Sequence, residues 1–328
     1  MTVLKSGELF AGYGGLALAV EQALNAKTEW VCEFEEAPSK ILAQHFPEAP
    51  NFRDVTAVDW EKVPPVDIIS GGSPCQDVSL AGSRRGMTDG TRSNLWVSMR
   101  EAIKTIRPRL VVWENVKGAR SATASSDLEP CPGCMGTGGG NDTEPALRAL
   151  GRVLGDLTSL GYSAQWRSIR ASDIGAPHHR ERVFVLAWRN DSYTYSDRRS
   201  AGREEPVQSN KIGSISARLG KCNSGGGATD KERNTKTQYN FREYTPSIER
   251  WELVTGNKAP DPGCPSRTGK IQLNPEFSEW MMGLPKGWVT NSDLGLTRAQ
   301  QLKAIGNGVV PQQAVIALAE MMANLEEK

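Results

Sequence analysis

The chain has 328 residues, of which 38% are hydrophobic and 23% charged, enough apolar material for a large core and two domains. The net charge of +1 excludes a wholly basic nucleic-acid-binding protein, but residues 189–270 hold fifteen Lys/Arg against ten Asp/Glu, which suits an anionic partner on one face. No apolar run approaches the roughly 20 residues that span a bilayer, and the N-terminus has no signal-peptide pattern. With six irregularly spaced cysteines, we expect a cytoplasmic protein with reduced thiols and no membrane contact.

The chain opens with the pattern of a strand, a Gly-rich turn and a helix. Residues 3–10 predict the strand and residues 16–24 the helix. The turn between them consists of Ala11, Gly12, Tyr13, Gly14 and Gly15. This order is typical of nucleotide-binding turns in doubly wound sheets, because glycine lets a ligand approach the backbone closely. A tight turn without a ligand is the alternative.

A second strand, over residues 29–34, ends in an acidic residue. Glu33 follows the Gly-rich turn by roughly 20 residues, the spacing at which a carboxylate binds a ribose hydroxyl pair. Phe34 beside it is placed to stack on an adenine ring. A solvated strand end and a core phenylalanine are the alternatives. After a helix over 38–46, Asp54 is a candidate acceptor for an adenine amino group, or forms an Asx turn.

The third strand, over residues 66–70, leads into the motif SGGSPCQ. Cys75 lies just past the strand end, after Pro74 and before a loop rich in Gly, Ser and Arg. We interpret it as a catalytic nucleophile, with a small buried hydrophobe as the alternative. The loop over 76–94 is too long and polar for a simple turn, which favours a mobile lid.

A helix over 95–106 precedes a fourth strand, over 110–113, with Glu114 at its C-terminal end. Ligand sites of open α/β sheets lie beyond the carboxyl ends of the strands. Cys75 and Glu114 are therefore expected to face the same crevice as the Gly-rich turn. An exposed strand-end carboxylate is the alternative for Glu114.

Residues 119–145 have a loop-like composition and contain Cys131 and Cys134 as a CxxC pair. One CxxC is half of a zinc site, and Cys222 and Cys264 are candidates for the other half. A solvated insertion without metal is the alternative.

A helix over 144–161 leads to two further strands, over 163–171 and 181–188. Arg180 and Arg182 alternate at the start of the second strand and should therefore face the same way. Two such guanidinium groups can clamp an anion or a polar base edge. Surface ion pairing is the alternative.

Beyond Asn190 the pattern becomes irregular and basic until about residue 240. We interpret this part as a binding module, with disorder as the alternative. Residues 273–288 form an amphipathic unit, and a Pro-initiated helix follows Gly306-Asn307-Gly308. We predict three parts. Residues 1–189 form a catalytic and cofactor-binding domain, residues 190–295 a target-recognition domain, and residues 296–328 a C-terminal segment that returns to the first domain.

In this order the motifs resemble those of bacterial and phage DNA (cytosine-5-)methyltransferases, which use S-adenosyl-L-methionine. FAGYGG resembles the family's first cofactor motif, SPCQ its nucleophile motif and ENV its base-protonating motif. RERVF resembles its arginine motif, LNPEFSEWMMGLP its ninth motif and AIGNGVVPQQ its last. The resemblance implies an α/β fold, a doubly wound Rossmann-like methyltransferase sheet with a smaller, irregular target-recognition domain. It also implies a monomer acting on double-stranded DNA, in a restriction-modification setting.

The resemblance also implies residue roles. Cys75 would attack C6 of a flipped cytosine while Glu114 protonates N3, and Arg182, with Arg180 beside it, would hold the base. The implied cofactor contacts are Phe10, Ala11, Gly12, Tyr13, Gly14, Gly15, Glu33, Phe34, Asp54, Val55, Pro74, Leu95 and Asn307. Phe34 stands where tryptophan is common in the family, and the CxxC insertion is not part of the shared motifs.

Three alternative functions would each have a distinguishing feature. A cytosine-5 tRNA methyltransferase on the same scaffold would methylate tRNA instead of duplex DNA. A catalytically inactive DNA-binding homologue would lack the set of Cys75, Glu114 and Arg182, which is intact here. A Rossmann-type oxidoreductase would bind NAD(P) and leave SPCQ and ENV without a role.

Overall fold

The computed structural model describes residues 2–73, 95–120, 123–124, 147–190, 239–266 and 268–326. Several sequence predictions fall outside these described residues: Pro74, Cys75, the lid at 76–94, Cys131, Cys134 and Cys222. Among the described residues, no helix is long and apolar enough to cross a membrane.

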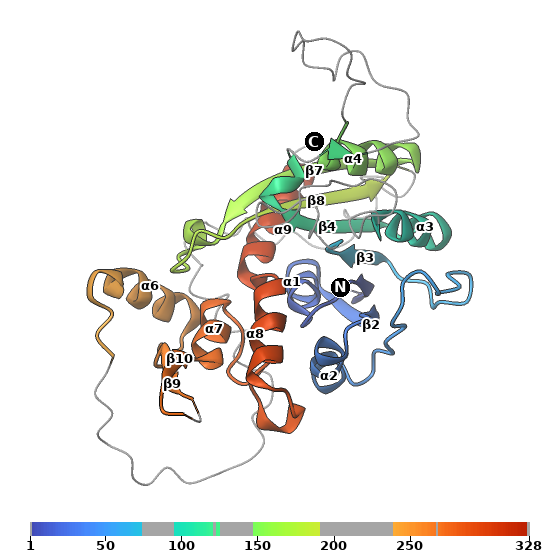
Figure 1. The fold of residues 1–328 in the computed structure, drawn as a ribbon. Helices are drawn as coiled ribbons and strands as arrows, with labels where there is room; N and C mark the ends of the chain where they lie inside the picture. Colours follow the sequence, from blue (N-terminus) through green and yellow to red (C-terminus); the bar gives the residue numbers. More distant parts are fainter. Residues whose placement is uncertain are drawn as a thin grey trace, which may run out of the picture.

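A six-stranded sheet in the order β2-β1-β3-β4-β8-β7 forms the centre of the fold (Figure 1). The strands are β1 (Leu4–Leu9), β2 (Ala26–Cys32), β3 (Ile68–Gly71), β4 (Leu110–Val116), β7 (Tyr162–Arg170) and β8 (Glu181–Arg189). The first four run parallel, whereas β8 pairs antiparallel with both β4 and β7. The predicted Rossmann-like sheet is confirmed, with an antiparallel pair at one edge.

Strand register brings the predicted site residues to one end of the sheet. Leu9 pairs with Gly71, and Gly71 pairs with Trp113, so the turn after β1 and the loop after β3 start level with Glu114. Because β8 runs the other way, its first residues reach the same end, and Arg182 pairs with Val116.

Helices cover both faces of the sheet. The main helices are α1 (Gly15–Leu24), α2 (Glu36–His45), α3 (Trp96–Ile106), α4 (Ala149–Ser159), α6 (Thr245–Thr255), α7 (Pro275–Met281), α8 (Arg298–Asn307) and α9 (Pro311–Glu326). Helices α1 and α9 lie side by side on one face and share a core cluster with Val112 and Phe184 (Figure 1). Helices α3 and α4 cover the other face, where Trp96 and Val153 pack with Val111.

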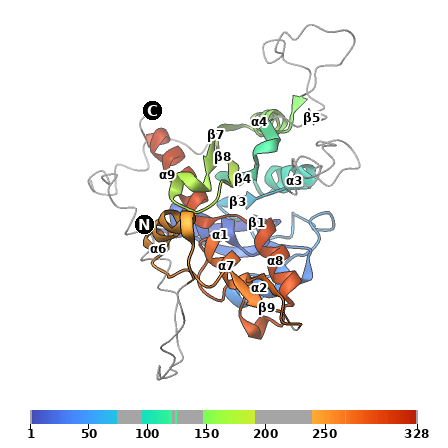
Figure 2. The ribbon, with the colours of Figure 1, turned by 60° about the vertical axis from the view of Figure 1, so that its left-hand side comes forward.

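The described residues after 239 pack against the α1 face. Buried side chains of α6, α7 and α8, among them Trp251, Trp280 and Ile305, belong to the core cluster of α1 and α9. Figure 2 shows the ribbons of α6, α7 and α8 gathered near α1. A short hairpin of β9 (Gly263–Pro265) and β10 (Ile271–Leu273) lies between α6 and α7 along the chain. The division into three domains stays a prediction.

Local signals explain several helix starts. Helix α8 begins with a capping box, in which Thr297 and Gln300 satisfy each other's backbone N–H groups. Helix α7 begins with Asn274, whose side chain accepts a hydrogen bond from Glu276 N, and Pro275 follows at the first helical position. Helix α9 starts at Pro311, as predicted.

The structure differs from the predicted elements in several places. Strand β2 runs over Ala26–Cys32 rather than 29–34, so Glu33 and Phe34 follow the strand. Strand β4 continues through Val116 instead of ending at 113, because β8 supplies hydrogen-bonding partners as far as Arg182. Helix α4 starts at Ala149 rather than at 144. Helix α6 and the β9–β10 hairpin were not predicted.

Short elements complete the described fold: β5 (Thr123–Ala124), β6 (Leu147–Arg148), and the 3-10 turns η2 (Lys117–Arg120), η3 (Ala171–Ile174), η5 (Arg242–Tyr244) and η6 (Ser292–Leu294).

Candidate active site

The Gly-rich turn after β1 is a tightly held backbone loop. Phe10 has φ 56°, an uncommon value for a residue with a side chain, and its N–H donates to Cys32 O at 2.8 Å. Gly12 has φ 54°, and no atom lies within 4 Å of the position that a Cβ would take there. The turn therefore leaves open space beside its backbone, as a bound ligand requires.

Glu33 joins this turn to the end of β2. Its carboxylate accepts hydrogen bonds from Gly12 N and Glu35 N, both at 2.8 Å. Burial raises the pKa of Glu33, although these two N–H groups oppose the rise. Each carboxylate oxygen has a second lone pair, so the group can still accept from ribose hydroxyls. Asn51, which the sequence analysis missed, fixes the Glu33 backbone by bonding both its N and its O.

Phe34 is 69% exposed, so its ring is free to stack on a planar ligand. It lines a surface pocket of about 460 Å³ that also contains Arg53 and Lys303. Lys303 of α8 forms an ion pair with Glu35 at 2.6 Å, which links the two walls of this pocket. The open turn, the Glu33 carboxylate and the exposed Phe34 ring together fit an adenosine-type cofactor.

The remaining predicted cofactor residues differ in placement. Asp54 accepts from Thr56 N at 3.0 Å and Thr56 Oγ1 at 2.7 Å, which is the Asx turn named as its alternative. Val55 is buried, Leu95 is half-buried and Asn307 is exposed at the end of α8. Their contact with a cofactor stays a prediction.

Tyr13 lies in the core instead of facing open space. Its side chain is fully buried, and its hydroxyl donates to Val309 O at 2.5 Å. A Cβ on Gly308 would lie 1.8 Å from the Tyr13 ring, so only glycine permits this packing. The Tyr13 side chain thus holds the turn against Gly306-Asn307-Gly308, the GNG motif.

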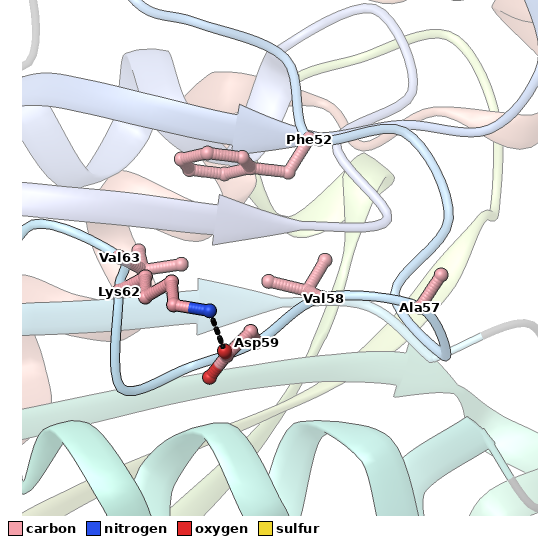
Figure 3. Close-up of a pocket in the computed structure, with 6 residues that line it drawn as sticks. All are labelled: Phe52, Ala57, Val58, Asp59, Lys62 and Val63. Carbon is pink, nitrogen blue, oxygen red and sulfur yellow. Dashed lines mark ion pairs between the residues drawn. The ribbon is translucent and has the colours of Figure 1, made fainter.

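A second large depression has no connection with the predicted site. It measures about 270 Å³ and is lined by Phe52, Ala57, Val58, Asp59, Lys62 and Val63 (Figure 3). Lys62 and Asp59 point toward each other and form an ion pair at 2.7 Å. Among the residues that the structure describes, no predicted site residue lines it, and we assign it no function.

Glu114 and Arg182 form the ionic centre of the site. Glu114 is 7% exposed, and Arg182 Nε lies 2.8 Å from its Oε1. Burial raises the pKa of Glu114, although Arg182 and Arg180 oppose the rise. The carboxyl group is therefore easier to protonate near neutral pH than an exposed glutamate, as a proton donor requires.

The loop that leads to Cys75 lies directly against this carboxyl group. A Cβ on Gly72 would stand 2.8 Å from Glu114 Oε2, so a side chain there would displace the carboxyl group. Gly72 precedes Cys75 by three residues in the sequence. The need for glycine here was not apparent from the sequence.

Asn115 holds the same loop by its side chain. Its Nδ2 donates to Ser73 O at 3.1 Å and to Ser73 Oγ at 3.3 Å, and its Oδ1 accepts from Val116 N at 2.8 Å. Trp113 Nε1 also donates to Ser73 Oγ at 3.2 Å. Asn115 is 3% exposed. Asn115 belongs to the ENV motif, but no local sequence signal indicates its hydrogen bonds to Ser73.

Arg180 faces a different partner from Arg182. Its Nη2 donates to Gly306 O at 3.0 Å and to Gly308 O at 2.6 Å, on either side of Asn307. Its positive charge also acts on Glu114, where it opposes the rise in pKa that burial causes. Arg180 thus holds the GNG motif in place, and its direct contact with a base stays a prediction.

Three cations surround one carboxylate at the start of β8. Lys117 Nζ, Arg120 Nη2 and Arg170 Nε lie 3.0, 3.6 and 3.5 Å from the oxygens of Glu181. The three side chains are 50%, 37% and 58% exposed. This basic cluster, defined by Lys117, Arg120, Arg170 and Glu181, has a surplus of two positive charges. Because side chains alternate along a strand, Glu181 and the neighbouring Arg182 point to opposite faces of the sheet.

Metal binding finds no support among the residues that the structure describes. They contain no group of three or more His, Cys, Asp or Glu side chains suited to a metal ion. Cys264, one of the candidate ligands, is a free thiol. The proposed partners Cys131 and Cys134 lie outside the described residues.

Comparison with known proteins identifies the family. Residues 4–257 match the family described as C-5 cytosine-specific DNA methylase. The chain belongs to this family. It is similar to the type II methyltransferase M.NlaIV of Neisseria lactamica, 29% identical over 190 residues, which are 56% of this chain and 41% of that protein. It is also similar to the type II methyltransferase M.HhaI of Haemophilus parahaemolyticus, 29% identical over 191 residues, 58% of this chain and 51% of the relative.

The chain thus spans about half the length of the curated relatives it matches. The fold is similar to the crystal structure of a prophage-encoded DNA modification methyltransferase from E. coli. That match has a TM-score of 0.55 and 18% sequence identity, and it covers 99% of this chain and 100% of the other. At this identity the likeness concerns the fold alone, and it agrees with the predicted methyltransferase sheet.

Proposed function

We propose that this chain transfers a methyl group from S-adenosyl-L-methionine to C5 of a cytosine in a specific duplex DNA sequence. The observation that supports this most is the buried Glu114 carboxyl group, paired with Arg182 and packed against Gly72, three residues before Cys75. A carboxyl group whose pKa is raised beside a guanidinium group suits donation of a proton to a ring nitrogen.

The first step uses the groups of this chain. C6 of cytosine is inaccessible within a duplex, so the base must be flipped out of the helix. The Cys75 thiolate then forms a bond from Sγ to C6 while the Glu114 proton moves to N3, which keeps the ring neutral. Arg182 would hold the resulting Glu114 carboxylate and the polar edge of the base.

The second step makes and breaks the remaining bonds. S-adenosyl-L-methionine, when bound, supplies the methyl group as an electrophilic carbon on a sulfonium sulfur. C5 of the adduct forms a bond to this carbon, and the carbon–sulfur bond breaks. The C5 proton passes to a solvent base, the Cys75–C6 bond breaks and the N3 proton returns to Glu114. The products are 5-methylcytosine, S-adenosylhomocysteine and one proton.

Cofactor binding is assigned to the carboxyl ends of β1 and β2. Glu33 would accept from the ribose hydroxyls, Phe34 would stack on the adenine ring, and the open backbone at Gly12 would approach the ligand. Methionine, adenosine and sulfonium groups need no metal for this binding.

The DNA backbone would contact the basic cluster around Glu181. Lys117, Arg120 and Arg170 are exposed, come from the same end of the sheet as Glu114 and are preorganised by one carboxylate. Phosphates are the anions that a duplex presents to exposed Lys and Arg side chains. Sequence recognition is assigned to residues 190–295, and a cytoplasmic role in restriction-modification is proposed.

Expression in a host without cytosine methylation tests the function. Sequencing of 5-methylcytosine in the host DNA should show methylation at one short sequence, and Cys75→Ala should abolish it while duplex binding persists. Methylation of tRNA in place of DNA would overturn the choice of substrate. Unchanged methylation by Cys75→Ala would overturn the mechanism.

A further inference from the structure

The Gly-rich turn is held by a residue that follows it by 275 positions in the chain. Trp288 Nε1 donates to Tyr13 O at 2.8 Å, and Trp288 is only 6% exposed. This bond acts on the backbone between Gly12 and Gly14, at the turn that we assign to cofactor binding.

Trp288 is itself fixed from two sides. Its indole stacks on the His45 ring, with centroids 3.6 Å apart and planes 5° from parallel. His45 Nε2 donates to Trp288 O at 2.8 Å. Phe46 completes the pocket by an edge contact at 6.2 Å. The indole N–H therefore has one direction available, toward Tyr13.

The loop that presents Trp288 is rigid as well. The buried carboxylate of Glu279, in α7, accepts hydrogen bonds from Gly287 N at 2.8 Å and from Val289 N at 2.5 Å. It also accepts from Thr290 N at 3.0 Å and Thr290 Oγ1 at 2.9 Å. Four donors to one carboxylate define the path of residues 287–290 on both sides of the indole.

We propose that Trp288 is a positioning residue for cofactor binding, which sets the shape of the Gly-rich turn through its bond to Tyr13 O. This proposal rests on the proposed function. It means that a segment assigned by sequence to target recognition builds part of the cofactor site. The chain of contacts runs from Glu279 through the 287–290 loop to Trp288 and ends at Tyr13.

Trp288→Phe tests the proposal, because it keeps a ring on His45 and removes only the N–H donor and part of the indole. One lost hydrogen bond predicts that the Kd for S-adenosylhomocysteine rises roughly 2- to 13-fold in calorimetry on the full chain. Binding of a duplex should not change. Hydrogen exchange of the amides at residues 10–15 should accelerate, with or without ligand.

Trp280→Phe is the matched control. Trp280 is also buried, lies in α7 and donates its Nε1 proton to Asn257 O at 3.1 Å, far in sequence from the turn. It should lower Tm comparably but leave the S-adenosylhomocysteine Kd and the exchange at 10–15 unchanged. Equal effects of the two variants would reduce Trp288 to a general structural role and overturn the proposal.

A gentler variant covers the case in which Trp288→Phe does not fold. His45→Phe keeps the stacked ring and removes the bond to Trp288 O, so a smaller rise in Kd and faster exchange at residues 10–15 are expected. Wild-type values for both would contradict the proposal. No binding of S-adenosylhomocysteine by the wild-type chain would instead refute the proposed function, while the exchange measurement would still decide the role of Trp288.

Discussion

The side chain of Asn115 ties the loop of the proposed nucleophile to strand β4, which makes Asn115→Ala a sharp test. Two hydrogen bonds reach Ser73 from one amide nitrogen, at 3.1 and 3.3 Å. A net contribution of about 0.5–1.5 kcal/mol each gives about 1–3 kcal/mol for the tether. If that energy keeps the loop in the reactive arrangement, its loss lowers the reactive population roughly 5- to 150-fold.

The assay is single-turnover methyl transfer at saturating S-adenosyl-L-methionine and duplex, which isolates the chemical steps from binding. Asn115→Ala should slow this rate by that factor, with the Kd values for S-adenosylhomocysteine and DNA unchanged. Ser73→Ala is the matched control, because it removes the Oγ contacts and keeps the carbonyl that Asn115 holds. It should cost less than tenfold.

Two results would refute this reasoning. One is a wild-type single-turnover rate for Asn115→Ala in a folded protein. The other is a parallel loss of rate and of both binding affinities, which would mean that Asn115 supports the fold in general and not the loop.

Three further predictions follow from charges in the site. Glu114→Gln cannot donate the proton and should slow methyl transfer by about 10²–10⁴ in a radiolabel assay, with S-adenosylhomocysteine binding retained; a rate within tenfold of wild type would exclude the acid role. A plot of log Kobs for DNA binding against log salt has a negative slope, and each of Lys117→Gln, Arg120→Gln and Arg170→Gln should make it shallower by about 0.9. Unchanged slopes for all three variants would exclude the basic cluster from the DNA interface. Glu8 is 2% exposed, and burial raises its pKa well above 4.5, so its protonated form favours the fold. Its contribution is fully present below the unfolded pKa and is lost as pH rises toward the folded value, by at most about 1.4 kcal/mol per pH unit. Glu8→Gln should flatten this fall in urea melts between pH 5 and 8, and an unchanged slope would contradict the assignment.

Much of the fold was predictable because its signals are local. Alternating and continuous apolar runs predicted each of the six sheet strands. The Gly-rich turn and Pro311 marked where α1 and α9 begin. Helix α6 was missed because only Ile248 and Trp251 on it are buried, which leaves too few apolar positions for a helical pattern.

The site was predictable in its residue types and less so in its contacts. Glu114 was placed at a strand end, but its ion pair with Arg182 depends on β8, which pairs antiparallel with β4. Tyr13 was predicted among the cofactor contacts, and the structure buries its side chain against Gly308 and Val309, so its contact with the cofactor stays a prediction. The bond from Trp288 to Tyr13 joins residues far apart in sequence, and no local pattern encodes such a pair.

Trapping of the covalent adduct tests the central claim most directly. A duplex with 5-fluorocytosine at the methylated position lets attack and methyl transfer proceed, but the C5 fluorine cannot leave as a proton does. With S-adenosyl-L-methionine present, a stable protein–DNA species should form, and mass spectrometry of its peptides should place the modified base on Cys75. Attachment to any other residue, or efficient methylation of normal DNA without any trapped species, would contradict the account.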